Sequence, residues 1–441
     1  MEAVILAGGK GTRLAEMASD LPKPLVPVLG APVLDYQIES LRRSGVTDVT
    51  IVVGHLGQQI KDHFGSGRPL GPRLRYFTED SPLGTGGALA YLRDRLPDPF
   101  VVLYGDLILD LDFARLFAFH GQQQSLCTLV VHPNNHPYDS DLVVTDSSGA
   151  IRQIAGKNEP RGRSYGNCVN AGICVLDRAV LDRLQAGAVY DLERDVIGPV
   201  VGEERAYVYR TTEYIKDMGT PERHAEVTRH VASGLVAGRN LKRKQRAIFL
   251  DRDGTINEYI GLLSDPRQLQ VPDEVYTALA AINDSGFLAI VVSNQPVVAR
   301  NLCSLDELNE INLRLEAMLG ERHVYLDDLM CCPHHPDRGF PEENREYKIA
   351  CACRKPGTAL LDRAVEAYNI DRRASYFVGD TTTDIQTGRN AGLRTVLLAT
   401  GKAGSDGKYD AHADLGAADL HDAVLMILAE AALLPAPADT N

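Results

Sequence analysis

A rhythm of short apolar runs and longer amphipathic segments occurs in two separate parts of the chain, and it limits the folds that the chain can adopt. Residues 1–231 alternate β-branched runs such as DVTIVVG and FVVLYGD with helix-like segments such as VLDYQIESLRRSG. This alternation predicts a mostly parallel sheet covered by helices. The rhythm stops near residue 232 and starts again at RAIFLD. The sequence therefore predicts an α/β fold with two doubly wound domains.

The break between the two rhythms locates a linker. Residues 232–246, ASGLVAGRNLKRKQR, lose the alternation and gather basic side chains at their end. A chain of 441 residues exceeds what one core usually organises, so about two or three domains are expected. We expect a first domain over 1–232, a linker over 233–245 and a second domain over 246–432, followed by a disordered tail.

Composition narrows the class of protein. The formal charge of −13 argues against a generic nucleic-acid or anionic-membrane surface, whereas small phosphorylated ligands in locally basic pockets remain open. The chain enters a β-like run directly after Met1, and no stretch approaches the roughly 18 apolar residues of a membrane span. We expect a cytoplasmic enzyme that acts on small molecules. The sequence leaves the oligomeric state open, a homo-oligomer included.

The first stretch with chemical character is VILAGGKGTRL, residues 4–14, in which a β-like run enters a glycine-rich loop. Glycines let backbone N–H groups approach phosphate oxygens, and cationic side chains offset the phosphate charge. The loop matches neither the P-loop motif nor the GxGxxG fingerprint. Taken alone, it is equally consistent with a flexible turn. Its candidate phosphate-binding residues are Gly8, Gly9, Gly11, Thr12 and Arg13.

Further motifs follow this loop in order. LPKPL places Lys23 between two prolines, which stiffen the backbone, and EDSPLGTGGAL supplies a second glycine-rich stretch. LYGD ends a strand at Asp106, and YIKDMGTPE supplies Asp217. A bland alternative for both aspartates is a helix cap or a surface turn.

Together these motifs resemble the sugar-1-phosphate nucleotidylyltransferase family over nearly the whole first 230 residues. The resemblance implies a Rossmann-like, GT-A-like domain in which the Gly8–Arg13 loop holds a nucleoside triphosphate and Lys23 lies at the α-phosphate. Asp106 and Asp217 would bind Mg²⁺. The base and ribose would be bordered by Gly84, Thr85, Gly86 and Gly87.

The sugar side of this site departs from the family pattern. Members commonly carry Glu-Lys-Pro after a β-like run, whereas IRQIAGKNEP retains Lys157 but has Gly156 in place of the glutamate. NAGICVL, which begins at Asn170, resembles a sugar-contacting strand of the family. The resemblance therefore implies that Lys157 and Asn170 bind the sugar phosphate.

The second rhythm opens with FLDRDGT, where Asp251 and Asp253 share one strand-to-loop turn. Two carboxylates so close are unfavourable unless a cation neutralises them, so the pair predicts a bound Mg²⁺. Ser293, Lys355 and Asp380 each follow a later apolar run, in VVSNQ, CRKP and FVGDTTTD. In a doubly wound sheet these strand tips share one edge, where ligands bind.

These four motifs resemble the haloacid-dehalogenase-like (HAD-like) phosphatases over residues 246 to about 400. The resemblance implies that Asp251 is the nucleophile, that Asp253 is the general acid and base, and that Ser293 and Lys355 hold the phosphoryl oxygens. Mg²⁺ would be held by Asp251, the carbonyl of Asp253, and Asp380.

Four of the eight cysteines crowd between residues 331 and 353, in CCPHHP and CAC. Three thiolates and one imidazole form a closed tetrahedral zinc site, which would be structural and would position the lysine of CRKP. Cys331 and His335 are alternative ligands, and the alternative without a metal is a cluster of reduced thiols. The expected zinc ligands are Cys332, His334, Cys351 and Cys353.

The cysteine-containing insert is similar to a capless, zinc-containing branch of these phosphatases, which includes heptose 1,7-bisphosphate 7-phosphatases and histidinol-phosphate phosphatases. NQPVVARN keeps Asn294 and Arg300 of the heptose-enzyme loop but loses both of its glycines, and Arg354 belongs to the shared CRKP motif. With SDLPKPL, which resembles heptose-1-phosphate guanylyltransferases, the expected substrates are GTP and heptose phosphates. Open alternatives are another sugar such as mannose 1-phosphate, a histidinol-phosphate-type phosphatase, and a first domain that senses nucleotide sugars without turnover.

Overall fold

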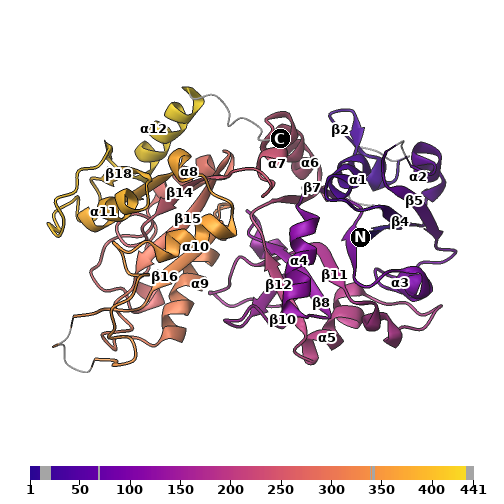
Figure 1. Cartoon of the computed structure of the whole chain (residues 1–441), viewed down its shortest axis with the longest axis horizontal. Helices are drawn as coiled ribbons and strands as arrows, with labels where there is room; N and C mark the ends of the chain where they lie inside the picture. Colours follow the sequence, from indigo (N-terminus) through magenta and orange to yellow (C-terminus); the bar gives the residue numbers. More distant parts are fainter. Residues whose placement is uncertain (10–20, 68–69, 338, 340–342, 434–441) are drawn as a thin grey trace. The chain divides into compact units, whose positions relative to one another are not determined.

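The computed structural model of the chain describes residues 1–9, 21–67, 70–337, 339 and 343–433 (Figure 1). The expected phosphate-loop residues Gly11, Thr12 and Arg13 lie outside these ranges. The chain forms two compact units. Unit 1 comprises 1–132, 141–156 and 168–240, and unit 2 comprises 133–140, 157–167 and 241–441. The domain limits 1–232 and 246–432 inferred from sequence remain a proposal beside this division.

Unit 1 contains most of the strands of the chain and several short helices (Figure 1). Its strands are β1 Glu2–Ala7, β2 Pro27–Val28, β3 Ala31–Pro32, β4 Asp48–Val53, β5 Arg73–Thr78, β6 Phe100–Tyr104, β7 Leu107–Asp110, β8 Cys127–His132, β9 Leu142–Thr145, β10 Ile151–Ala155, β11 Val169–Leu176, β12 Ala206–Arg210 and β13 Tyr214–Asp217. Its helices are α1 Val33–Arg43, α2 Gly57–Phe64, α3 Gly87–Leu92, α4 Phe113–Gln123, α5 Gly198–Gly202, α6 Pro221–Ala232 and α7 Leu235–Gly238.

The main sheet of unit 1 is mixed. Strands β6, β1, β4 and β5 are parallel neighbours, as the alternating sequence predicts. Strand β11 runs antiparallel to both β6 and β8. Strand β9 pairs antiparallel with β10, which follows it after a short turn. Strands β7 and β13 form a separate antiparallel ribbon.

Both faces of this sheet are covered. Side chains of β1 alternate between two apolar cores: Ala3 and Ile5 enter one core, and Val4 enters the other. A strand that is buried on both faces reads as a continuous apolar run, which explains the sequence AVILA. The ends of the strands, rather than their faces, are therefore left for polar side chains.

Unit 2 has the simpler topology. Its sheet follows the order β16-β15-β14-β17-β18-β19, and these neighbours are parallel. The strands are β14 Arg246–Leu250, β15 Phe287–Asn294, β16 Asp328–Cys332, β17 Tyr376–Gly379, β18 Arg394–Leu398 and β19 Leu415–Ala417. The helices are α8 Asp273–Asn283, α9 Leu305–Glu321, α10 Ala359–Ala367, α11 Thr382–Asn390 and α12 Leu420–Leu433.

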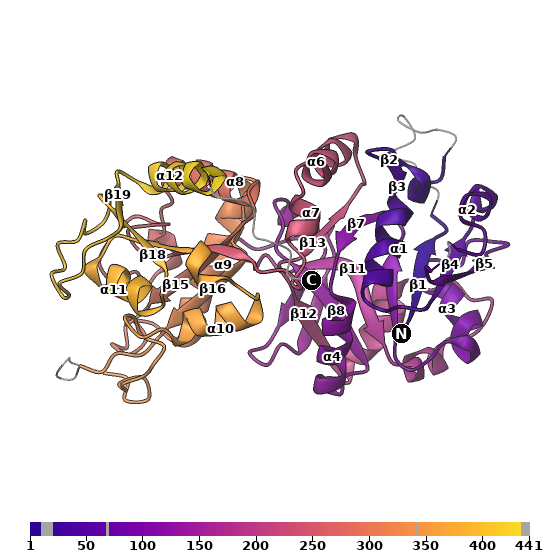
Figure 2. The same ribbon diagram turned by 45° about the horizontal axis from the view of Figure 1, so that its top comes forward.

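Helices cover both faces of the second sheet. Buried side chains of α8, α9 and α12 share one core with Ile248 and Leu250 of β14, and those of α10 share the other with Ala247 and Phe249. Helices α8 and α12 run side by side (Figure 2). Because all the strands point the same way, their carboxyl ends meet at one edge, as the sequence predicts.

Helix caps define where two of these helices begin. Ser304 and Glu307 form a capping box at the start of α9, and Thr381 and Asp384 form another at the start of α11. In such a box each side chain bonds a free backbone N–H of the first turn. The second box fixes Asp384 beside the end of β17. Within the described ranges, no helix combines the length and the apolar character that a membrane crossing needs.

Candidate active sites

Strand β1 ends in the expected phosphate loop, of which Gly8 and Gly9 are described. A Cβ atom on Gly8 would lie 2.4 Å from Oε2 of Glu79, so a larger residue there would require the end of the Glu79 side chain to shift. Among the described residues, no atom lies within 4 Å of a Cβ added to Gly9. Burial raises the pKa of Glu79, and no described residue forms a hydrogen bond with its buried Oε1.

The structure brings three predicted residues of unit 1 together. Nζ of Lys23 lies 3.1 Å from Oδ2 of Asp106, which follows strand β6. Strand β13 pairs with β7 so that Asp217 lies opposite Leu107, and the N–H of Met218 donates to the carbonyl of Asp106 at 3.1 Å. The β7–β13 ribbon therefore places the backbones of Asp106 and Asp217 side by side.

Both carboxylates already have cationic neighbours. Arg223 of α6 donates to Oδ2 of Asp217 at 2.7 Å, and the N–H of Gly219 donates to the same oxygen at 3.1 Å. The side chains of Asp106 and Asp217 are about one-third exposed, at 30% and 35%. Two accessible carboxylates on adjacent backbones are an oxygen donor set that fits Mg²⁺.

A buried polar cluster that sequence reasoning missed surrounds Asn170. Asn170 donates to Oε1 of Glu193 at 3.2 Å, and the hydroxyl of Tyr104 donates to the same carboxylate at 2.8 and 2.9 Å. Burial raises the pKa of Glu193, although the hydrogen bond from Tyr104 opposes this effect. The sequence LERDVI gave no signal that this glutamate faces Asn170.

A bulge in β11 shapes this cluster. The pairing of β11 with β8 changes register between Asn170 and Cys174. Gly172, at this bulge, has a φ of +71°, and an added Cβ would lie 2.6 Å from the ring of Tyr104. Only glycine suits a left-handed backbone this close to an aromatic ring. The N–H of Gly172 donates to Oδ1 of Asn170 at 3.0 Å, which helps to orient the amide.

The second glycine-rich stretch packs against protein. A Cβ on Gly84, whose φ is +77°, would lie 2.3 Å from the carbonyl oxygen of Tyr190, and one on Gly87 would lie 2.8 Å from that of Ala188. Thr85 accepts a hydrogen bond from the N–H of Leu192 at 2.8 Å. Packing therefore accounts for these glycines whether or not they also border a nucleoside. Gly86 likewise approaches Val196.

The two predicted sugar-site residues, Lys157 and Asn170, fall in different units. Lys157 is exposed, follows the end of β10, and falls in a segment that belongs to unit 2. Asn170 falls in unit 1. The two residues are therefore not brought together within one unit.

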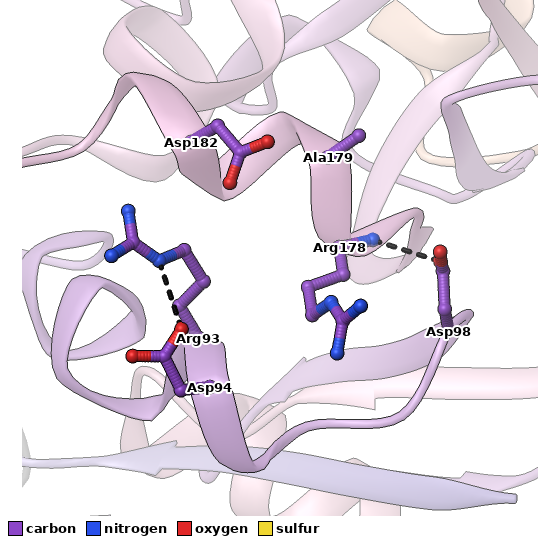
Figure 3. A pocket seen from close by; sticks show the side chains of 6 residues that line it. All are labelled: Arg93, Asp94, Asp98, Arg178, Ala179 and Asp182. Atoms are coloured by element: carbon purple, nitrogen blue, oxygen red, sulfur yellow. Dashed lines mark hydrogen bonds and ion pairs between the residues drawn. The ribbon is translucent and has the colours of Figure 1, made fainter.

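A polar hollow of about 350 Å³ in unit 1 lies away from these residues (Figure 3). Asp98, which precedes β6, belongs to it, whereas Asp106 follows the other end of that strand. Within it, Nε of Arg93 lies 3.4 Å from Oδ1 of Asp94, and the backbone N–H of Arg178 donates to Oδ1 of Asp98 at 2.9 Å. The hollow is thus not part of the Asp106 site. It is lined by Arg93, Asp94, Asp98, Arg178, Ala179 and Asp182.

In unit 2 the predicted catalytic side chains meet at the carboxyl edge of the sheet. Nζ of Lys355 lies 2.8 Å from Oδ1 of Asp251 and 2.6 Å from Oδ1 of Asp384. Asn294 holds the backbone of Lys355 from both sides, because its amide accepts from the N–H at 2.9 Å and donates to the carbonyl at 3.1 Å. Strand β15 therefore positions the lysine of CRKP.

The charges around Lys355 shift one another. Burial lowers the pKa of Lys355, but the carboxylates of Asp251 and Asp384 outweigh this effect and raise it above its usual value. Burial, aided by the charge of Asp384, raises the pKa of Asp251 even though Lys355 opposes the shift. Burial likewise raises the pKa of Asp380 to about 6. The negative charge of the buried carboxylates at this site therefore exceeds the positive charge of Lys355.

This edge fits a divalent cation. Carboxylate oxygens of Asp251, Asp380 and Asp384 lie within 4.8 Å of one another, and the buried Oδ1 of Asp380 has no hydrogen-bond partner among the residues that the structure describes. The other oxygen of Asp380 accepts from the N–H of Lys402 at 2.7 Å. An oxygen donor set with one free buried acceptor suits Mg²⁺. Asp384 joins the residues expected there, and its signal was its place four residues after Asp380.

Asp253 lies beside the predicted phosphoryl-binding serine. Gln295 donates to Oδ2 of Asp253 at 2.7 Å, and the same amide lies 2.9 Å from Oγ of Ser293. Burial raises the pKa of Asp253, but the Arg252 guanidinium and the hydrogen bonds from Gln295 and Asn257 outweigh it, so the pKa is lowered. Gln295 belongs to the NQPVVARN loop that resembles the loop of the heptose enzymes, whereas Arg252 is a further residue that the sequence did not single out.

The cysteine cluster forms in the predicted combination. Ligand atoms of Cys332, His334, Cys351 and Cys353 all lie within 4.8 Å of one another. Sγ of Cys353 lies 3.2 Å from Sγ of both Cys332 and Cys351, and Nδ1 of His334 lies 3.4 Å from Sγ of Cys353. Three sulfurs and one nitrogen so arranged fit a structural zinc ion.

The alternative ligands have other contacts. Sγ of Cys331 accepts from Asn312 at 3.6 Å, and His335 lies 3.8 Å from Asp337. Arg354 donates to the carbonyl of His334 at 2.9 Å, which ties the cysteine cluster to the residue before Lys355. Arg300 is half-buried, and its N–H donates to the carbonyl of Pro296 at 2.9 Å.

Two protein families match different parts of the chain. Residues 2–234 match the nucleotidyl transferase family, and residues 352–423 match the HAD-hydrolase-like family. The mannose-1-phosphate guanylyltransferase of Mycobacterium tuberculosis is 33% identical over 225 residues, which cover 50% of this chain and 62% of that protein. The chain thus spans less than two-thirds of the length of this relative.

Two solved structures are also similar. HddC from Yersinia pseudotuberculosis is 23% identical with a TM-score of 0.45, over 52% of this chain and 99% of that one. The D,D-heptose 1,7-bisphosphate phosphatase from B. bronchiseptica is 25% identical with a TM-score of 0.38, over 42% of this chain and 99% of that one. The family match over more than half of the residues decides the assignment. The chain belongs to the nucleotidyl transferase family, and its second unit is a HAD-like domain.

Proposed function

We propose that the chain is a bifunctional enzyme of GDP-heptose synthesis. Unit 2 removes the 7-phosphate of D-glycero-D-manno-heptose 1,7-bisphosphate, and unit 1 transfers GMP from GTP to the resulting heptose 1-phosphate. The observation that carries the proposal is a lysine beside aspartates at strand ends in each unit: Lys23 beside Asp106, and Lys355 beside Asp251 and Asp384.

In the transferase reaction, an oxygen of the sugar phosphate attacks the α-phosphorus of GTP, and the bond to pyrophosphate breaks. No covalent protein intermediate is needed, because positioning and charge neutralisation lower the barrier. Lys23 offsets charge at the α-phosphate. Asp106 and Asp217 would hold Mg²⁺, which neutralises phosphate charge when it is bound.

In the phosphatase reaction, a carboxylate oxygen of Asp251 attacks the phosphorus and the bond to the sugar oxygen breaks. Asp253 gives a proton to that departing oxygen. Asp253 then takes a proton from a water molecule, whose oxygen attacks the phosphorus and frees Asp251. Ser293 and Lys355 hold the phosphoryl oxygens. The residues that would hold Mg²⁺ are Asp251, Asp253 through its carbonyl, Asp380 and Asp384.

The heptose assignment rests on motifs of the sequence. CPHHP, CRKP and NQPVVARN resemble the heptose phosphatases, and SDLPKPL resembles the heptose guanylyltransferases. The two activities fit one chain because the product of the first is the acceptor of the second. A second candidate acceptor is mannose 1-phosphate, which the identity of 33% to the mycobacterial enzyme favours.

A product assay tests the proposal. The full chain is incubated with Mg²⁺, each of the four nucleoside triphosphates, and either heptose 1,7-bisphosphate or mannose 1-phosphate, and the products are identified by mass. We expect phosphate release from the bisphosphate and GDP-heptose with GTP. GDP-mannose as the dominant product would favour the second candidate. Faster phosphate release from histidinol phosphate than from the bisphosphate would overturn the assignment of unit 2.

A further inference from the structure

Arg252 stands between the two acidic residues of FLDRDGT and is fully buried, with 0% of its surface exposed. A guanidinium never loses its charge in a protein, so a buried one requires paired acceptors. Its Nη2 lies 2.9 Å from Oδ1 and 3.2 Å from Oδ2 of Asp253, and its Nε lies 3.2 Å from Oδ1. Arg252 therefore grips the carboxylate of Asp253 with two nitrogens.

The other arm of the guanidinium is anchored to α9. Nη1 of Arg252 donates to Oδ1 of Asn312 at 3.1 Å, and Nδ2 of Asn312 lies 3.6 Å from Sγ of Cys331 in β16. A guanidinium is planar and rigid, so a partner on each side fixes its orientation. Asn312 thus keeps the Arg252 guanidinium in the orientation in which it binds the Asp253 carboxylate.

The carboxyl group of Asp253 is also linked, through Gln295, to the predicted phosphoryl-binding Ser293. The Asp253 side chain keeps 19% exposure, whereas that of Arg252 keeps none. Its Oδ2 shares the amide of Gln295 with Oγ of Ser293. Arg252 therefore backs the carboxyl group from the protein interior, and Oδ2 is the oxygen turned toward Ser293.

We propose that Arg252, fixed by Asn312, is a positioning residue that holds the carboxyl group of Asp253 against the departing oxygen of the substrate. The inference rests on the proposed phosphatase function, in which Asp253 supplies the proton. It also gives Asn312 a role in that reaction from a helix that carries none of the expected catalytic residues.

Two substrates with different leaving groups distinguish this positioning role from a purely structural role of Arg252. When the bond between phosphorus and a sugar oxygen breaks, that oxygen must receive the proton of Asp253. A nitrophenolate departs as a stable anion and needs no proton. The value of kcat/KM covers the steps up to leaving-group departure, so it reports the first transfer and not the later attack of water.

The experiment measures kcat/KM of the full chain for heptose 1,7-bisphosphate and for p-nitrophenyl phosphate. The variants are R252M, R252K and N312L, with D253N as the reference and R267M as a matched surface control whose side chain is 88% exposed. We expect R252M to lose about 100-fold on the bisphosphate and less than about 10-fold on p-nitrophenyl phosphate, as for D253N. R252K should lie between wild type and R252M, N312L should lose about 10-fold on the bisphosphate only, and R267M should not change.

Equal losses on the two substrates in R252K and N312L would overturn the inference, as would unchanged activity in both. Circular dichroism and thermal unfolding of the same variants report whether unit 2 is folded, and R252K and N312L decide the matter if R252M does not fold. A wild-type chain that releases phosphate from neither substrate would instead refute the proposed phosphatase function.

Discussion

At the scale of single residues, what a side chain touches decides its role more than its type does. His120 lies 3.0 Å from Asp177 and 3.1 Å from Ser125, a combination that in an open cleft would suggest a nucleophile. Ser125 and His120 are only 2% and 3% exposed, so neither is accessible to a substrate. The set is a buried polar network, which specifies packing instead.

Replacing His120 tests this reading. His120→Leu removes the ring nitrogens that Asp177, Ser125 and Thr128 contact, so unfolding of unit 1 should become easier by about 2 kcal/mol. Thermal unfolding of the full chain measures this loss, and His55→Leu, at an exposed position, is the control. Transferase activity below the unfolding temperature should be retained. A folded variant without that activity would show that the network has a chemical role.

Glu193 gives a pH-dependent prediction. Its pKa in the folded chain is raised from the ordinary value of 4.5, so ionisation costs stability as the pH rises above that value. Glu193→Gln removes this cost and keeps an acceptor for Tyr104. The variant should therefore unfold at a higher temperature than wild type near pH 7.5, and the difference should vanish below about pH 4.5. An unchanged or lower unfolding temperature at pH 7.5 would show that the carboxylate is well accommodated in its charged form.

At the scale of elements, the acidic residues at the strand ends could be predicted from the sequence, whereas the tertiary contacts that position them could not. Motifs such as LYGD and FVGD locate acidic residues just after apolar runs, and parallel strands bring such residues to one edge. The ribbon of β7 and β13 could not be foreseen, because antiparallel pairing of distant strands leaves no local signal. The packing of Gly84 against Tyr190 could not be foreseen either. Glycines are expected in this stretch whether they pack against protein or border a nucleoside, so the sequence does not distinguish the two roles.

The bulge in β11 is one such element. Gly172→Ala should destabilise unit 1 by on the order of 2 kcal/mol, since a side chain there has a strained φ and meets Tyr104. Gly121→Ala is the matched control, because this glycine lies in α4 with open space around it and alanine should stabilise the helix by about 0.5–1 kcal/mol. Denaturant unfolding of both variants measures the difference. Equal effects would show that the bulge does not require glycine.

The cysteine cluster predicts a metal content. The purified chain should contain one zinc ion, and Cys351→Ser should lose most of it, because three remaining donors no longer close the tetrahedron. Cys168→Ser, outside the cluster, should retain it. Elemental analysis per chain decides the point. Phosphatase activity should fall together with zinc content, because Arg354 links the cluster to Lys355.

At the scale of the whole molecule, the sequence predicts two α/β domains, and the two compact units and the two family matches support that prediction. The two phosphoryl sites stay a prediction. The limits of the units were harder to predict from the sequence. Residues 133–140 and 157–167 belong to unit 2, although they lie within the alternating pattern of the first 231 residues. Long-range packing of loops has no periodic signature, so sequence patterns do not report it. Activity is therefore best measured on the full chain rather than on a fragment cut at residue 232.

The most direct test of two independent sites compares Asp106→Asn with Asp251→Asn in one reaction. The full-length variants receive heptose 1,7-bisphosphate, heptose 1-phosphate, GTP and Mg²⁺, and phosphate and pyrophosphate are measured separately. We predict that D251N loses phosphate release by at least about 1,000-fold and keeps pyrophosphate release, and that D106N shows the reverse. Loss of both products from either single substitution, in a chain that still unfolds cooperatively, would contradict the account.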